Sequence, residues 1–107
     1  MSDITRVRDL NDALRAHGIG GRIFVTHGVA DLPNDLRARA IAGVQAFNCF
    51  TPENDPYGEH DFGALEIDGT RVFFKIDYYG AGGLHSPDPS DPTITARVLT
   101  IMLAEEY

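Results

Sequence analysis

The sequence predicts an α+β domain in which three helices cover a small, mainly antiparallel three-stranded sheet, made of one strand plus a β-hairpin. Two observations lead to this fold class. An Asp-Gly pair at residues 68–69 separates two runs rich in β-branched and aromatic residues, which is typical of a two-residue hairpin turn. Three other stretches repeat apolar residues at helical spacing. Because strands and helices alternate too rarely for a doubly wound sheet, a sheet covered by helices fits better.

The first 30 residues predict a helix followed by a short strand. Ser2 or Asp3 can cap the helix, and Gly18 is expected to end it. Residues 22–26, RIFVT, alternate in the manner of a strand that ends at His27. The apolar residues of the helix recur at Ile4, Val7, Leu10 and Leu14.

A second helix is expected to begin near Pro33. Proline is tolerated in the first turn of a helix, and the carboxylate of Asp35 complements the positive helix end. The apolar stripe of this helix comprises Leu36, Ala40, Ile41, Val44 and Phe47.

A third helix is predicted from about Thr93 to Glu105. Asp91 and Pro92 supply an N-cap and a proline at the first helical position. The many β-branched residues here make a strand the competing prediction, and the cap favours the helix. Its broad apolar face indicates deep burial or contact with a partner subunit, so a homodimer through this C-terminal helix is one expectation. That face comprises Ile94, Val98, Leu99, Ile101, Met102 and Leu103.

The hairpin turn fixes the register of its two strands. Ile67 then faces Thr70, and the pairing continues outward one residue at a time. Extending the ladder brings His60 opposite Asp77. The predicted core face holds Leu65, Ile67, Val72, Phe74 and Ile76. The other face is mixed and holds Phe62, Glu66, Arg71, Phe73, Lys75 and Asp77.

Length and composition place the chain among small soluble proteins. Its 107 residues suit one domain, residues 1–107. We expect no membrane association and a cytoplasmic location, because no apolar run approaches the roughly 20 residues that cross a bilayer and no signal-peptide core is present. The single cysteine, Cys49, excludes an internal disulfide. Because Phe47 and Phe50 lie close to it in the sequence, we expect Cys49 to be buried and chemically inert.

The net charge of −7 is unevenly distributed. Residues 1–50 carry six Arg and five Asp, a balance of +1, whereas residues 51–107 carry three basic and eleven acidic residues, a balance of −8. Direct binding to nucleic acid requires a basic surface and is not expected. The natural complement is a basic surface of a protein partner, or a cation; solubility is the alternative reason for the acidity.

The candidate site is the loop of residues 51–61, which leads into the hairpin. It contains four acids, one histidine and no Lys or Arg, and its prolines and Asn-Asp pair predict a loop. Aromatic residues beside carboxylates suit a protein interface. The candidate binding residues, in the loop and along the adjoining strand, are Glu53, Asp55, Tyr57, Glu59, His60, Asp61, Asp77 and Tyr79.

Two kinds of chemistry are open at this loop. Glu59, His60 and Asp61 are metal-binding types, but neighbours in an extended chain point to opposite faces, so we expect no metal site and no cofactor. His60 with Asp77 would supply the base and orienting acid of a catalytic triad, and the sequence suggests no nucleophile for it. Loop hydrogen bonds and a structural His60–Asp77 pair are the simpler interpretation, so no catalytic residue is assigned.

Four motifs resemble a known family. They are NDPYGEHDFG at residues 54–63, KIDYY at 75–79, SPDP at 86–89 and RVLTIMLA at 97–104. With them the chain resembles, over nearly its whole length, a bacterial family of small proteins classed as a domain of unknown function and common on plasmids and mobile elements. Gly80 departs from the acidic residue that often follows the paired tyrosines. The resemblance implies a mobile-DNA setting and assigns no catalytic residue.

Three functions from different classes are consistent with the sequence. The favoured prediction is a small acidic, non-enzymatic binding protein. It would inhibit a nucleic-acid-handling system, of the anti-restriction or anti-CRISPR type, by occupying a basic protein surface. The second is a metal-assisted or acid–base enzyme that uses His60 and the nearby carboxylates. The third is an accessory subunit of a plasmid or phage system, recognised through its C-terminal helix.

Overall fold

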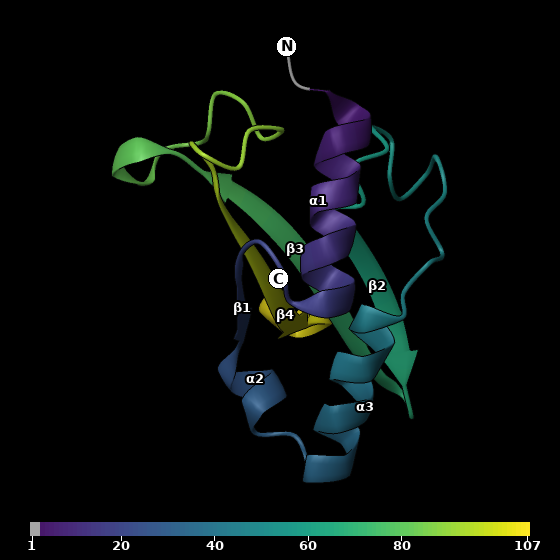
Figure 1. The fold of residues 1–107 in the computed structure, drawn as a ribbon. Helices are drawn as coiled ribbons and strands as arrows, with labels where there is room; N and C mark the ends of the chain where they lie inside the picture. Colours follow the sequence, from purple (N-terminus) through teal and green to yellow (C-terminus); the bar gives the residue numbers. More distant parts are fainter. Residues whose placement is uncertain (1–2) are drawn as a thin grey trace.

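A computed structural model describes residues 3–107, which form one four-stranded sheet with helices packed on one face (Figure 1). Within these residues, no helix is both long and apolar enough to cross a membrane. The elements in chain order are α1 (Ile4–His17), β1 (Arg22–Val25), α2 (His27–Ala30), α3 (Asn34–Gln45), β2 (Phe62–Ile67), β3 (Thr70–Tyr79), η1 (Ala81–Gly83), β4 (Ala96–Leu103) and η2 (Ala104–Glu106).

The first helix begins and ends where the sequence predicts. Asp3 is its N-cap, and one carboxylate oxygen accepts hydrogen bonds from the backbone N–H groups of Thr5 and Arg6 at 3.0 and 3.3 Å. The other cap candidate, Ser2, lies outside the described residues. Gly18 adopts φ 70° and donates its N–H to the Leu14 carbonyl at 2.9 Å, so it closes the helix as glycine commonly does.

The hairpin has the predicted register. Ile67 pairs with Thr70, and the pairing continues residue by residue to Phe62 opposite Lys75. Asp68 and Gly69 have φ values of 49° and 81°, both positive, as a type I′ turn requires. The predicted core face is confirmed. Val72, Phe74 and Ile76 are buried, and Leu65 and Ile67 pack against the core.

The predicted third helix is wrong. Residues 96–103 form β4, which lies between β1 and β3 in the sheet order β1-β4-β3-β2. The strand runs parallel to β1 and antiparallel to β3, so the sheet is mixed and four-stranded instead of three-stranded. A homodimer through a C-terminal helix therefore has no basis in this fold.

Two features explain why the segment is a strand. Its β-branched residues favour extended backbone, and a central position in the sheet gives it two pairing partners. The expected helix cap belongs to a local turn instead, because the Asp91 carboxylate accepts hydrogen bonds from the backbone N–H and the hydroxyl of Thr93 at 2.9 and 2.6 Å. An aspartate can thus satisfy a turn without starting a helix.

The core lies between the sheet and the helices. In Figure 1, α1 and α3 lie across the same face of the sheet. Val7 and Leu14 of α1 and Val44 of α3 are fully or almost fully buried, and they belong to one cluster with Phe74 of β3 and Leu99 of β4. The opposite face of the sheet carries, among the described helices, only the short turn η2 near the C-terminus.

Candidate functional site

A cleft of about 540 Å³ opens where four segments of the chain meet. Its lining includes Tyr57, Glu59 and Asp61 from the loop of residues 51–61, which we call the acidic loop. Tyr78 from the end of β3 and His85 from the loop that follows β3 also line it. The N-terminal half of α1 and the proline-rich segment 86–89 complete its walls. This cleft gathers three of the sequence-predicted residues, and we call it the acidic cleft.

Buried polar groups hold Glu59 at the acidic cleft. The hydroxyl of Tyr78 donates a hydrogen bond to the Glu59 carboxylate at 2.8 Å. The side-chain amide of Asn11, which is fully buried in α1, donates both to the Tyr78 hydroxyl at 2.8 Å and to the Glu59 carbonyl at 2.9 Å. Both the backbone and the side chain of Glu59 are therefore fixed by the core.

Arg97 lies behind this pair and is only 2% exposed. Its Nε donates to the Asn11 side-chain oxygen at 2.6 Å, and its terminal nitrogen donates to the Pro89 carbonyl. The guanidinium carbon lies 5.2 Å from the Tyr78 ring centroid, within cation–π range. Burial lowers the pKa of Arg97, while Tyr78 and Glu59 act in the opposite direction. The hydrogen bonds compensate the cost of burying this cation.

Burial, assisted by the neighbouring carboxylates, raises the pKa values of Asp61 and Tyr78. Burial is the largest cause of the raised pKa of Asp61, followed by repulsion from Glu59. Burial also raises the pKa of Tyr78, and the carboxylate of Glu59 adds to that effect. Within residues 3–107, neither Glu59 nor Asp61 forms an ion pair. The cleft therefore presents two carboxylates without a direct ion-pair partner, and the buried Arg97 interacts with Glu59 only at longer range.

His60 does not pair with Asp77 as predicted. The regular ladder ends at Phe62, and His60 adopts a positive φ of 57°, which turns its side chain towards α1. Its Nδ1 lies 2.9 Å from a carboxylate oxygen of Asp12, and its Nε2 lies 3.6 Å from Asp55. The ring stacks on Phe50 with 3.8 Å between centroids. His60 thus fastens the acidic loop to the first helix.

The four loop acids do not form one exposed array. Glu53 is exposed, but the side chain of Asp55 is only 6% exposed and accepts a hydrogen bond from the His60 N–H at 3.1 Å. Asp61 is half-buried, and its carbonyl accepts from the Ile76 N–H at 2.8 Å. Asp55 is therefore a structural residue of the loop and Glu53 a surface residue outside the acidic cleft.

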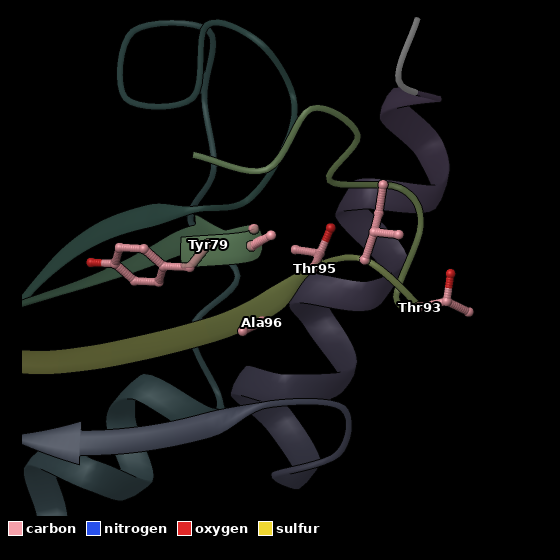
Figure 2. Close-up of a pocket in the computed structure, with 7 residues that line it drawn as sticks. Tyr79, Thr93, Thr95 and Ala96 are labelled. Carbon is pink, nitrogen blue, oxygen red and sulfur yellow. The ribbon is translucent and has the colours of Figure 1, made fainter. Parts of the chain in front are cut away.

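Asp77 and Tyr79 do not line the acidic cleft. The Asp77 carboxylate is 3.2 Å from Lys75 on the sheet face opposite the helices. Tyr79 lines a separate hollow of about 510 Å³ at the end of the sheet, together with residues 80–81 and 93–96 (Figure 2). The structure thus divides the predicted site residues between the two faces of the molecule.

Cys49 is exposed, so the prediction of a buried cysteine is wrong. Helix α3 ends at Gln45, and the side chains of Phe47 and Phe50 take the partly buried positions against the core. The thiol lies 3.8 Å from the Asn48 side-chain oxygen.

Within residues 3–107, no group of three or more His, Cys, Asp or Glu side chains could hold a metal ion.

The sequence interpretation missed Asn11, Tyr78 and Arg97 as residues of the site. A charged residue within the apolar run at residues 96–103 was a visible signal of a buried cation. Its partners could not be read from the sequence, because Arg97 and Asn11 are 86 residues apart along the chain.

Comparisons with known proteins place the chain in a family. Searches of curated proteins and of solved structures each returned no match. A family model described as "Protein of unknown function (DUF3768)" matches residues 25–106, which include three of the four strands completely, the acidic loop and Arg97. The chain therefore belongs to this family of unknown function.

Proposed function

We propose that this chain is a small acidic binding protein that docks through the acidic cleft on a basic surface of a protein partner. The proposal rests on one observation. Glu59 and Asp61 line the cleft, and neither forms an ion pair within the described residues. An arginine or lysine from a partner would relieve the repulsion between these two carboxylates.

The surroundings of the cleft fit such a contact. Tyr57 lines the cleft and is 75% exposed, so its ring is available to a partner cation or apolar group. Glu59 is held by Tyr78 and Asn11 before any partner arrives, which reduces the entropy that binding costs. The net charge of −7 favours rapid encounter with a positively charged surface.

The family resemblance suggests the partner to test first. A mobile-DNA setting favours a nucleic-acid-handling complex, whose DNA- or RNA-binding surface is basic by necessity. An acidic protein seated on that surface would compete with the nucleic acid, which is an inhibitory activity of the anti-restriction or anti-CRISPR type.

The test is affinity capture from a host lysate followed by mass spectrometry. The baits are the wild-type chain and a Glu59→Gln/Asp61→Asn variant, which keeps side-chain shape and removes two charges. Glu105→Gln/Asp9→Asn is the control, because it makes the same net-charge change at exposed positions outside the acidic cleft. We expect a protein with a basic surface that the wild type and the control capture and the cleft variant loses. Equal capture by all three baits would contradict the proposal.

A further inference from the structure

The sheet has one face that the long helices leave uncovered. Even-numbered residues of β3 from 72 to 78 are buried, so the odd-numbered residues 71–79 lie on the other side. We call these residues and their neighbours across the strands the open sheet face. Strand pairing adds Phe62 of β2, Thr100 of β4 and Phe24 of β1 to it. Tyr107 contacts one end of this face, where it meets Phe62 and Phe73.

The charges on the open sheet face balance one another. Strand pairing places the basic residues Arg22, Arg71 and Lys75 on this side. Glu66 and Asp77 lie there too, and Glu106 lines the same hollow as Lys75. This neutrality contrasts with the balance of −8 over residues 51–107. The open sheet face therefore adds no local charge repulsion to the overall repulsion between two chains of net charge −7.

Aromatic side chains give this face contact area. The rings of Phe62 and Phe73 meet edge-to-face at 5.3 Å, and the Arg71 guanidinium lies 5.6 Å from the Phe73 centroid. Phe24 on the edge strand is 51% exposed. Exposed aromatic groups bordered by charged residues are typical of protein interfaces.

A hollow of about 500 Å³ lies on the open sheet face and contains both signs of charge. Lys75, Asp77 and Thr100 line it, and the Lys75 ammonium is 3.2 Å from the Asp77 carboxylate. A base and an acid side by side are self-complementary under a two-fold rotation, because each can meet the opposite group of the second copy.

We propose that two copies of this chain associate through their open sheet faces and form a two-fold symmetric dimer. The two sheets would pack face to face about 10 Å apart, as in a β-sandwich. In that arrangement Lys75 of each copy pairs with Asp77 of the other, and the aromatic rings are removed from water. The acidic clefts lie on the helix side of each sheet and stay accessible, so this inference is independent of the proposed function.

Sedimentation equilibrium tests the dimer. We expect the wild-type protein to reach twice its chain mass of 11.7 kDa as the concentration rises. Lys75→Asp places acids at positions 75 and 77, beside Glu106, and Asp77→Lys places bases at both positions, so each variant alone should dimerise about tenfold or more weakly. An equimolar mixture of the two variants should restore a dimer, because acid then meets base across the interface.

The matched controls are Arg8→Asp and Asp9→Lys, which make the same charge changes on α1, and circular dichroism verifies the fold of each variant. Both controls should associate as the wild type does. A wild-type chain that stays at monomer mass up to millimolar concentration would overturn the proposal. So would open-face variants that dimerise normally, or a mixture that stays monomeric.

Discussion

The hydroxyl of Tyr78 donates a 2.8 Å hydrogen bond to the carboxylate of Glu59, and this bond joins the buried end of β3 to the acidic loop. Tyr78 in turn accepts from Asn11, which also receives a bond from Arg97. The network therefore links α1, β3 and β4 to the loop that carries the acidic cleft. Its members support one another, so the loss of one leaves other buried groups without partners.

Tyr78→Phe should destabilise the protein by about 1–3 kcal/mol, because it removes a partner from both Asn11 and Glu59 while preserving the ring. Tyr79→Phe is the matched control, since that neighbouring ring is 40% exposed and should tolerate the change. Urea unfolding measures both free energies. Equal losses in the two variants would show that the Tyr78 hydroxyl has no special role.

Asn11→Leu should cost about 3 kcal/mol or more, because it leaves the Nε of the buried Arg97 without its hydrogen-bond acceptor. Combined with Tyr78→Phe, the loss should be smaller than the sum of the two single losses, since both changes break the same network. A double-mutant cycle measures this coupling, and strict additivity would argue against a connected network.

Gly69→Val should lower the free energy of unfolding by more than about 1 kcal/mol, because β-branched residues are strained at positive φ. A Cβ at this position meets nothing within 4 Å, so the loss of stability comes from backbone strain and not from a steric clash. Gly69→Asn is the comparison, because asparagine tolerates this backbone region better. If valine and asparagine gave equal melting temperatures, strain at the turn would not be the cause.

The raised pKa of Asp61 makes stability depend on pH. The folded state holds the proton of Asp61 more tightly than the unfolded chain does. The contribution of Asp61 to the free energy of unfolding therefore decreases as the pH rises from its ordinary pKa of 3.8 through the raised pKa of the folded state. Asp61→Asn should therefore stabilise the protein near neutral pH and approach the wild type in acid. Thermal unfolding from acid to neutral pH tests this, and a constant difference between the two proteins would contradict it.

The parts of the fold that local sequence determines could be predicted. The cap at Asp3, the end of α1 at Gly18 and the hairpin turn at Asp68 depend on neighbouring residues, and all three agree with the structure. β4 could not be assigned in the same way, because its residues suit both helix and strand. The pairing with β1 and β3 decides between them, and it depends on the whole fold.

The candidate site was predictable only in part, for a similar reason. The loop acids Glu59 and Asp61 were identified from composition and do line a cleft. The error at His60 came from extending a ladder past its end, where a positive φ redirects the side chain to Asp12. The buried groups behind the cleft come from segments far apart in sequence, so no local pattern reveals them.

Surface plasmon resonance with the captured partner tests the acidic cleft most directly. Association should be fast at about 50 mM salt and markedly slower at about 500 mM, because salt screens attraction between a basic surface and these carboxylates. The Glu59→Gln/Asp61→Asn variant should associate several-fold more slowly than the wild type and lose most of the salt dependence. The control variant Glu105→Gln/Asp9→Asn should retain more of the association rate and more of its salt dependence. A cleft variant that binds like the control, or wild-type association that does not change with salt, would place the partner surface elsewhere on the molecule.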